Sequence, residues 1–495
     1  MDAGQSLLAS EIYRKGLKTY RNDPPAVQWL TFNLMQSESA AHGARAVQQY
    51  VATILDSGIN WPAKLYTLEL ALAAASDGDD NIDVLYNQAL ACIKAFAASD
   101  PAPEDINVMS CHTIARHILR LAGGRHPDPL FHSTVTEDRY PVVTSLPLQA
   151  TPPGSIDDCN RLPTSIVAAQ TGFRQPLRPV GIRHCGEGYL ARLGDNTLLF
   201  DRTGSVLDTP YGPLPLFLRL VLEKLFHKLQ IRRRIQGKSL FIGDYFSQAL
   251  NYCHWVVDNL PRLLVARRLS FDFAHVIGVF MLQAPFQAAT LERVLSPGQD
   301  YLAFAQDDGL VAFDELYFVD NASIAHFDHP LLGCDAHLTS ALVDDLTATV
   351  TPQRSRRLYV PRRHSRSVLN PGEIEPLLAA YGFETIDTDA MSFSEQVATF
   401  AEAEAIVGPH GAALTNILFS PPTSKLVEFF PAFGGSPTFY RLATARGQSY
   451  SCYIDDETHG ANRDQAGTLL SNTTGMRVNP DWLHQWLKNN LERDR

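Results

Sequence analysis

Apolar and polar residues alternate in short blocks along the last third of the chain. From Arg357 onward, short apolar runs are separated by segments whose apolar positions recur every three to four residues. The spacings of Asn370 with Glu373, and of Ser392 with Glu395, are typical of N-terminal capping boxes of helices. The apolar runs predict strands at 358–360, 383–387, 405–407, 426–430 and 450–454, with helices between them. This alternation predicts a parallel sheet covered by helices on both faces.

Three loops follow the predicted strands at the edge of the sheet where ligands bind in such folds, namely residues 361–366, 408–412 and 430–436. The second loop reads Gly-Pro-His-Gly-Ala and opens directly into a helical pattern. The small residues Gly411 and Ala412 let a ligand approach the backbone, and the free N–H groups at a helix start carry partial positive charge. The turn therefore predicts a site suited to phosphate.

The first of these loops is basic although the chain as a whole is acidic. The formal charge is −11, yet residues 354–366 contain six arginines and no carboxylate. Arg362 and Arg363 directly follow a strand on the ligand side, and planar guanidinium groups match phosphate oxygens. The alternative is a solvated charge run at a strand end. His410 either donates to a phosphate or braces the turn, and Glu428 either accepts hydrogen bonds from ribose hydroxyls or is an edge-of-strand acid.

A second group of polar residues lies upstream, in a segment with helical periodicity. His254, Asp258 and Arg262 recur at a spacing of four and share one face of a helix, although Pro261 can bend that helix. A carboxylate one turn from a histidine orients the ring and stabilises its protonated form, as a general base requires. The alternative is a buried His–Asp hydrogen bond that holds the domain together.

In their order along residues 185–455, these motifs resemble glycosyltransferase family 61. The matching pieces are Tyr-x-His-Trp-x-x-x-x-Leu-Pro-Arg-Leu from Tyr252, Arg-Leu-Tyr-Val-Pro-Arg-Arg from Arg357, Asn370 with Glu373, Glu395-Gln396, and Gly-Pro-His-Gly-Ala-x-Leu-Thr-Asn from Gly408. The resemblance implies an inverting, metal-independent transferase with a nucleotide-sugar donor. It implies an α/β fold in which two Rossmann-like domains face each other across a cleft, the glycosyltransferase B-type fold. It also implies a base from His254 or Asp258 and a nucleotide site formed by Arg362, Arg363, His410, Gly411, Ala412, Asn416 and Glu428.

The other main glycosyltransferase fold carries an Asp-x-Asp metal site, and Asp387-Thr388-Asp389 has the same pattern. These residues directly precede a capped helix. We interpret them as the polarity of a loop and a helix start rather than as metal ligands, so that no metal is expected.

The sequence before these motifs changes character. Residues 1–125 are Ala-rich with apolar positions at helical spacing, and they predict an all-α domain that resembles an irregular helical-repeat stack. This domain either grips an acceptor or a partner, or packs as a structural cap. Residues 126–180 are Pro-rich and predict an extended connection. The N-terminal Rossmann-like domain is expected at 181–345, with its first short strands at 188–192, 197–201 and 206–207, and the C-terminal one at 346–495.

Composition narrows the class of protein. Hydrophobic residues make up 45% of the chain, as in a globular protein, and the acidic balance argues against nucleic-acid binding. The seven scattered cysteines predict free thiols in a reducing compartment. The N-terminus lacks a basic-then-apolar signal, and no apolar run reaches the length of a membrane span, so we expect a cytoplasmic protein. Residues 214–238 end in three arginines and form either a basic amphipathic helix at the inner membrane or a core helix with a solvated end.

These patterns and the resemblance together predict a glycosyltransferase that uses no cofactor and takes a nucleotide sugar, by resemblance a UDP-sugar, as its donor. The expected acceptor is a hydroxyl of a glycan, a lipid-linked sugar or a protein, in the synthesis of bacterial capsule, another surface polysaccharide or a glycoconjugate. A noncatalytic adaptor with a degenerate transferase domain is the alternative from another class. A sugar-nucleotide epimerase is disfavoured because no Gly-x-Gly-x-x-Gly follows an early strand.

Overall fold

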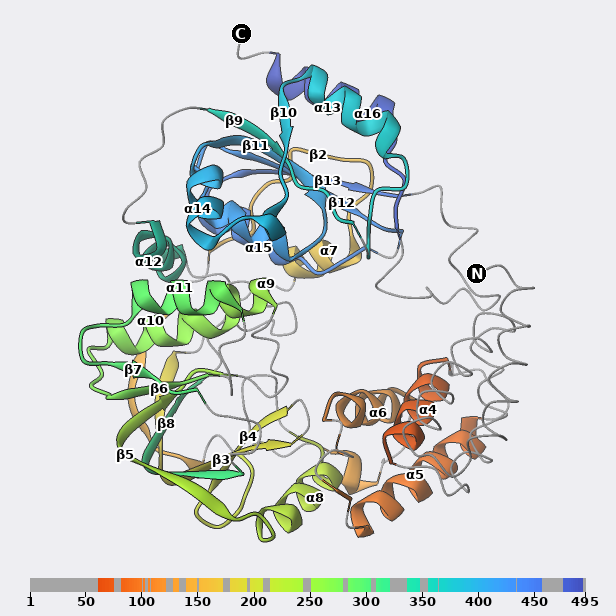
Figure 1. The fold of residues 1–495 in the computed structure, drawn as a ribbon. Coiled ribbons are helices and arrows are strands. Elements are labelled where there is room, and N and C mark those ends of the chain that lie inside the picture. Colours follow the sequence, from red (N-terminus) through yellow and green to blue (C-terminus); the bar gives the residue numbers. More distant parts are fainter. Residues whose placement is uncertain are drawn as a thin grey trace.

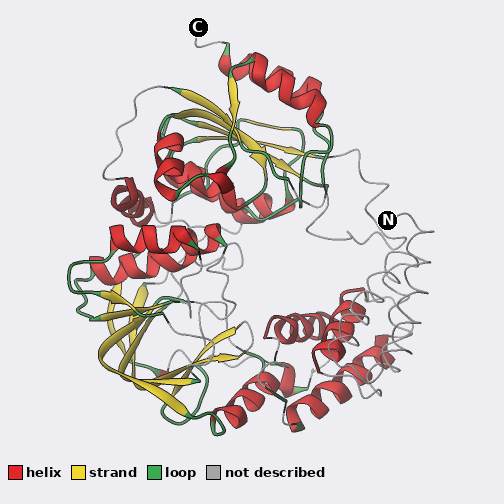
Figure 2. Cartoon of the chain, in the orientation of Figure 1, coloured by secondary structure: helices red, strands yellow, loops and turns green. Residues whose placement is uncertain are grey.

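The computed structural model places a mixed sheet at the centre of the chain, between a group of helices and a second, parallel sheet (Figure 1). It describes residues 61–74, 82–99, 101–102, 106, 108–121, 128–132, 139–148, 151–171, 179–193, 196–207, 214–243, 251–278, 284–303, 309–320, 336–347, 355–363, 365–432, 434–455 and 475–492. Figure 2 shows a layer of helices between the two sheets. The helices expected within residues 1–60 lie outside the described residues.

The second sheet has the predicted parallel architecture. Its strand order is β10-β9-β11-β12-β13-β2, and every neighbouring pair is parallel. The strands are β9 (Arg356–Tyr359), β10 (Phe383–Thr385), β11 (Ala403–Pro409), β12 (Lys425–Phe430), β13 (Ser449–Ile454) and β2 (Asp158–Cys159). From the first strand of this domain, β9, the chain adds β10 on one side and then β11, β12 and β13 in succession on the other side. The order therefore reverses between β9 and β11, and ligands bind at such a point in doubly wound sheets.

Helices cover both faces of this sheet. α13 (Pro371–Ala380) and α16 (Pro480–Leu491) pack on one face. α14 (Phe393–Ala401), the 3-10 helix η7 (Ala412–Phe419) and α15 (Thr438–Arg446) contribute to the core on the other face. The predicted helix after Gly411 is thus present, although it is a 3-10 helix rather than an α-helix.

Of the two predicted capping boxes, one is confirmed and one is wrong. The Ser392 hydroxyl accepts from the Glu395 amide, and the Glu395 carboxylate accepts from the Ser392 amide at 2.7 Å. Asn370 precedes α13 but makes no side-chain cap. Its amide instead pairs with the backbone of Val478 at 2.8 and 3.0 Å, which joins the start of α13 to the segment that leads into α16.

The first sheet is mixed rather than Rossmann-like throughout. Its strand order is β1-β3-β8-β5-β6-β7, with β4 paired to β3. β8, β5, β6 and β7 are parallel to one another, whereas β3 pairs antiparallel with β1, β4 and β8. The strands are β1 (Val142–Leu146), β3 (Val180–Leu193), β4 (Asn196–Asp201), β5 (Ile231–Phe241), β6 (His275–Ile277), β7 (Asp300–Tyr301) and β8 (Leu310–Val319). The strands expected at 188–192 and 197–201 are present within β3 and β4, and residue 206 forms an isolated bridge to Phe200.

The expected single helix over residues 214–238 is wrong. α8 (Leu216–Phe226) ends before the arginines, and Arg232 to Arg234 lie on β5. Arg234 forms ion pairs with Asp314 on the neighbouring strand and with Glu187 on the strand beyond it, so the basic run belongs to the sheet surface. Among the described residues, no helix combines the length and apolarity needed to cross a bilayer.

The N-terminal helices share a core with the first sheet. α4 (Trp61–Ala74), α5 (Ile82–Ala98) and α6 (Val108–Leu121) bury Leu68, Ile93 and Ile114, which belong to one cluster with Phe217 of α8 and Leu198 of β4. This shared core is what a structural cap on the domain requires.

A second apolar core continues from one sheet to the other. It contains Trp255 and Leu264 from the helical segment after residue 251, Leu342 of α12 (Ala336–Thr347), Phe400 of α14 and Leu442 of α15, all buried. Each such side chain contributes about 1.5–3 kcal/mol when it leaves water. The two sheets are therefore joined by packed side chains. The cleft expected between two Rossmann-like domains is largely filled by this core, and a pocket remains where the two halves meet.

The segment between the N-terminal helices and β3 contributes a strand to each sheet. β1 joins the first sheet, whereas β2 becomes the last strand of the second sheet and is followed by α7 (Thr164–Thr171). Cys159 of β2 and Cys452 of β13 form a disulfide, with Cα atoms 4.9 Å apart. The expectation that all cysteines are free thiols is therefore wrong, because a Pro-rich connection gave no sign that it would add a strand beside Cys452.

Replacing Cys159 with serine should lower the free energy of unfolding by about 2–4 kcal/mol, because the disulfide closes a long loop in the unfolded chain. Thermal unfolding with and without reductant checks this. Reductant should bring the wild type to the stability of the variant and leave the variant unchanged. Cys185→Ser, at a free cysteine, is the matched control and should keep the response to reductant. A wild type that is insensitive to reductant would contradict the prediction.

Candidate functional site

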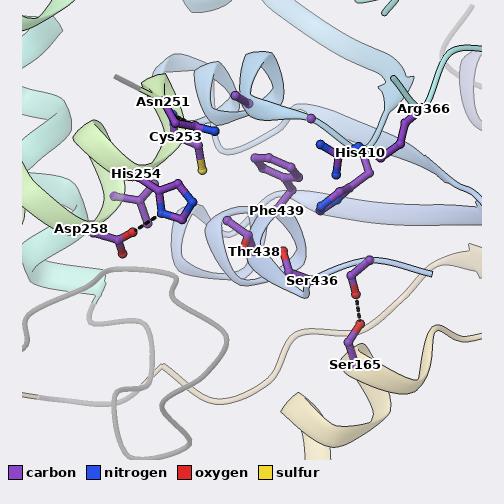
Figure 3. A pocket seen from close by; sticks show the side chains of 14 residues that line it. Ser165, Asn251, Cys253, His254, Asp258, Arg366, His410, Ser436, Thr438 and Phe439 are labelled. Carbon is purple, nitrogen blue, oxygen red and sulfur yellow. Dashed lines mark hydrogen bonds and ion pairs between the residues drawn. The ribbon is translucent and has the colours of Figure 1, made fainter. Parts of the chain in front are cut away.

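A pocket of about 580 Å³ lies where elements of both sheets meet. From the first half of the chain it is lined by Asn251, Cys253, His254, Val257 and Asp258. Arg366, His410, Gly411, Ala412, Gly435, Ser436, Thr438 and Phe439 line it from the second half, and Ser165 of α7 completes it. In Figure 3, His254 and Asp258 approach from one side, and His410 and Arg366 from the other. The two motifs that the sequence singled out are thus brought together.

The His254–Asp258 pair is positioned by an interrupted helix. Asn251 caps α9 (Tyr252–His254) by accepting from the Cys253 amide, and a π-helical turn (Trp255–Asn259) separates α9 from α10 (Leu260–Arg268). Nδ1 of His254 lies 2.7 Å from Oδ2 of Asp258. The Asp258 side chain is 3% exposed and that of His254 is 24% exposed, so a ligand can reach the ring but scarcely the carboxylate.

This geometry fixes the chemistry of the His254 ring. An ionised carboxylate can only accept, so Asp258 favours the tautomer with the proton on Nδ1, and the basic nitrogen of the neutral ring is then Nε2. Arg262, which the spacing placed on the same face, instead donates to the backbone carbonyls of Ile242 and Gly243 and is buried. The π-helical turn before Pro261 changes the angular position of later residues, which explains this difference.

A second histidine–carboxylate pair lies on the opposite wall of the pocket. Nδ1 of His410 is hydrogen-bonded to Oε1 of Glu428, and the Tyr450 hydroxyl donates to Oε2 at 2.6 Å. Burial and the adjacent carboxylate hold the pKa of Tyr450 well above its usual value, so its hydroxyl remains a donor. The His410 ring stacks on Phe430, with centroids 5.2 Å apart. Three groups therefore hold this ring in one orientation.

Glu428 lies behind His410 rather than at the surface of the pocket. It is fully buried and does not line the pocket, so it differs from the rim carboxylate that the sequence suggested for ribose. Alternate residues of a strand point to opposite faces of the sheet. The sequence of β12 alone does not reveal which of these faces meets the ligand. The sequence gives no sign that Tyr450 of β13 would take the second carboxylate oxygen.

The three arginines of the loop after β9 have different surroundings. The Arg362 guanidinium donates to the backbone and hydroxyl of Ser365 at 2.8 Å and to the His410 carbonyl at 3.2 Å. A Cβ at Gly411 would meet this guanidinium, so glycine leaves the space that the Arg362 side chain occupies. Arg363 is 71% exposed and forms an ion pair with Asp387 at 2.6 Å. Arg366 enters the pocket itself.

Arg362 and Arg363 line a second cavity of about 370 Å³ on the other side of the Gly411–Ala412 turn. Asp387, Thr388 and Asp389 also line it. The Asp-x-Asp segment is a loop and a short 3-10 helix before α14, as interpreted from the sequence, but it faces this cavity. Among the described residues, no group of three or more His, Cys, Asp or Glu side chains could hold a metal ion.

Asn416 lies between the two halves of the chain rather than in either cavity. Its amide oxygen accepts from the Tyr252 hydroxyl at 2.7 Å, and its nitrogen donates to Gln396 at 2.8 Å. It therefore connects α9 to η7 and α14 beside the pocket. The sequence grouped Asn416 with the nucleotide-binding residues because it shares their motif, whereas the structure gives it contacts that orient α9.

Sequence reasoning missed several pocket residues. Ser165 donates to the carbonyl of Gly435, which is 270 residues away in the chain, and nothing in its local sequence points to this site. Cys253 lies between the motif residues Tyr252 and His254, and the sequence pattern did not identify it as a pocket residue. Burial raises the pKa of its thiol to about 12, so it remains a neutral thiol rather than a nucleophile. Arg366 was one of six arginines, and its backbone conformation could not be read from composition.

Two α/β sheets that share a pocket, one of them doubly wound with its switch point beside that pocket, are the arrangement of glycosyltransferases with a B-type fold. Residues 252–427 match the model of the family Glycosyltransferase 61. The match begins at α9, includes the His254–Asp258 pair, the arginine loop and His410, and ends one residue before Glu428.

Two curated relatives are each similar to a stretch of about 120 residues of this chain. One is alpha-1,3-arabinosyltransferase XAT3 of Oryza sativa subsp. japonica, 30% identical over 121 residues, which cover 22% of this chain and 20% of the relative. The other is the EGF domain-specific O-linked N-acetylglucosamine transferase of Drosophila melanogaster, 31% identical over 119 residues, which cover 22% of each chain. The matched part thus spans about a fifth of these relatives.

Proposed function

We propose that this protein is an inverting glycosyltransferase that moves a sugar from a nucleotide-sugar donor to a hydroxyl group of an acceptor. The observation that carries the proposal is the shared pocket, in which a histidine held at Nδ1 by a buried carboxylate faces a glycine turn at a helix start. One side of such a pocket can remove a proton, and the other can stabilise a departing anion. The family of residues 252–427 supports the same reaction class.

The proposed donor lies across the Gly411–Ala412 turn, because that turn lines both cavities. Its diphosphate rests on the turn, its nucleoside occupies the cavity of Arg362 and Arg363, and its sugar points toward His254. Asp387 and Asp389 supply acceptors for ribose hydroxyls in that cavity, a role that the buried position of Glu428 does not suit. Glu428 acts through His410 by holding its ring toward the ligand.

In the proposed step, the acceptor hydroxyl forms a bond to the anomeric carbon while the bond from that carbon to the phosphate oxygen breaks. The hydroxyl proton moves to Nε2 of His254, and Asp258 stabilises the resulting imidazolium. The nucleoside diphosphate leaves with the electron pair of the broken bond. Helix N–H groups and cationic side chains stabilise the new charge, and each well-placed donor contributes about 3 kcal/mol.

The proposal includes a UDP-sugar as the donor, no bound metal, and a glycan, lipid-linked or protein acceptor in polysaccharide or glycoconjugate synthesis. The two relatives are named as transferases of arabinose and of N-acetylglucosamine, the second onto EGF domains. Those names support a glycan or protein hydroxyl as the acceptor class. They do not favour one donor over the other.

A screen of nucleotide sugars tests the proposal. One UDP-, GDP-, CMP- or TDP-sugar should raise the melting temperature of the purified protein, because a ligand that binds only the folded state stabilises it by mass action. The same compound should release its nucleotide when acceptors are added, with EDTA making no difference. Stabilisation without any transfer or donor hydrolysis would favour the adaptor alternative, and loss of activity in EDTA would contradict the metal-free part.

A further inference from the structure

A series of hydrogen bonds runs beside the pocket, from the first half of the chain into the second. The Tyr252 hydroxyl donates to the amide oxygen of Asn416 at 2.7 Å, and the amide nitrogen of Asn416 donates to the amide oxygen of Gln396 at 2.8 Å. The amide nitrogen of Gln396 donates to the backbone carbonyls of Thr388 and Met391 at 3.1 and 3.2 Å. We call Tyr252, Asn416 and Gln396 the amide bridge.

The two backbone carbonyls at one end fix the direction of every hydrogen bond in the amide bridge. A carbonyl can only accept, so the group of Gln396 that faces Thr388 and Met391 is its nitrogen. The Gln396 oxygen therefore faces Asn416, which has to present its nitrogen there and its oxygen to Tyr252. Tyr252 must then donate, and burial keeps its hydroxyl protonated by raising its pKa. Turning over either amide would break these bonds, so the bridge has a single arrangement.

The amide bridge connects the two elements that carry the proposed reacting groups. Tyr252 begins α9, the single helical turn that ends at His254, and the Asn259 side chain holds the His254 carbonyl at 3.0 Å from the following π-helical turn. Asn416 lies on η7, the helix that begins at Ala412 of the glycine turn. A displacement of Tyr252 against Asn416 therefore moves the proposed base relative to that turn.

The surroundings of the bridge leave the position of the Tyr252 ring to its hydroxyl. The ring contacts Phe286 of α11 (Pro285–Val294) and Phe393 of α14, with centroids 5.3 and 6.5 Å away. These apolar contacts hold the ring against both halves of the chain without selecting one position. The hydrogen bond to Asn416 is directional, and Asn416 is fully buried and also bonded to the Ala413 carbonyl at 3.1 Å.

We propose that Tyr252 and Asn416 are positioning residues for the transfer step. Their hydrogen bond sets the distance between His254 and the Gly411–Ala412 turn, across which the proposed donor lies. The described linings of the two cavities include neither residue, so both act through α9 and η7 rather than by touching the substrate. This inference rests on the proposed function for the reaction that it affects. A small displacement of a base from its substrate can cost about 100-fold in rate.

The test compares Tyr252→Phe and Asn416→Ala with Asn370→Ala. Asn370 is the matched control, because it is a buried asparagine of the second half that joins two elements through both atoms of its amide, away from both cavities. The probes are UDP-N-acetylglucosamine and UDP-arabinose, whose sugars occur in the names of the two relatives. Release of UDP at saturating probe, with water as the acceptor, measures turnover, and calorimetry with UDP measures donor affinity.

Turnover should fall at least about 10-fold in both bridge variants, while the affinity of Tyr252→Phe for UDP stays within about threefold of the wild type. The pH dependence of turnover should keep its apparent pKa, because the contact between His254 and Asp258 is untouched. The double variant should be no slower than the slower single variant, since both remove the same contact. Asn370→Ala should lose stability but not turnover.

Three results would overturn the inference. The first is turnover of Tyr252→Phe within about twofold of the wild type, since a positioning contact cannot be lost without a cost in rate. The second is a double variant whose loss is the product of the two single losses. The third is an equal loss of turnover in Asn370→Ala, which would show that general stability rather than the position of α9 determines the rate.

Amide hydrogen exchange separates a failure of this inference from a failure of the proposed function. Exchange at residues 253–259 should be at least about fivefold faster in the two bridge variants than in the wild type, and unchanged in Asn370→Ala. If the wild type releases no UDP from either probe, the proposed function falls for these donors and exchange decides: faster exchange supports the positioning of α9, and unchanged exchange overturns it. If the wild type and Tyr252→Phe release UDP equally, the proposed function stands and the positioning role falls.

Discussion

His254→Ala should reduce the rate of sugar transfer by about 10²–10⁴-fold while leaving donor affinity within about threefold. Among the described residues that line the pocket, His254 is the histidine on the proposed acceptor side, and its partner Asp258 is a buried carboxylate. Without His254, the acceptor hydroxyl has no positioned base and must lose its proton to water. Donor binding depends on the opposite wall, so it should survive. The measurements are turnover at saturating donor and calorimetric affinity for the donor nucleotide.

Asp258→Asn is the matched variant for this prediction. An asparagine can still contact Nδ1 of His254, but it cannot stabilise the imidazolium, so turnover should fall while the melting temperature changes little. Its pH–rate profile should shift relative to that of the wild type, because the group that takes up the proton is a weaker base. If His254→Ala lost donor affinity and kept normal turnover at saturation, the assignment of a base would be untenable.

Glu428→Ala should be the most destabilising single change at the site. It leaves the buried Nδ1 of His410 and the buried hydroxyl of Tyr450 without their common acceptor. Each buried donor that loses its acceptor costs about 1–3 kcal/mol, because it stays desolvated. Donor affinity should fall too, since His410 loses the contact that fixes its ring. Chemical denaturation and nucleotide binding measure the two effects separately.

Tyr450→Phe is the control for Glu428→Ala. It removes one donor to Glu428 but keeps the hydrogen bond to His410, so it should cost only about 1 kcal/mol and leave donor affinity nearly unchanged. Similar losses in both variants would mean that the general packing of this region, rather than the orientation of His410, determines binding.

The second sheet could be predicted from the sequence because its signals are local. Strands there are short apolar runs, and helices begin at recognisable residues such as Ser392. The first sheet resisted prediction because β3 is a long bulged strand whose ends pair with different partners. Of its antiparallel neighbours, β1 comes from the Pro-rich connection and β8 from much later in the chain, and strand pairing over such distances leaves no periodic signal.

In the candidate site, too, the residues with local signals could be predicted and those with distant partners could not. The His254–Asp258 pair follows from a spacing of four within one helical segment, so the sequence found it. The roles of Glu428 and Asn416 depend on partners in other elements, Tyr450 and Tyr252, and the sequence assigned both to direct ligand contact. Arg366 enters the pocket from a backbone conformation with a positive φ, which its local sequence does not signal. Such residues become visible only when three-dimensional neighbours are known.

The crossing of β2 determines how the protein can be dissected. An excised piece beginning near residue 346 would contain every helix of the doubly wound half but not Asp158 and Cys159, which pair with Ser451 and Cys452 along the outer side of β13. Its border strand would then offer unpaired backbone groups to another molecule, a recognised route to aggregation. A truncated version for crystallisation or nucleotide titration should therefore carry residues 151–171 in the same polypeptide, joined by an engineered linker.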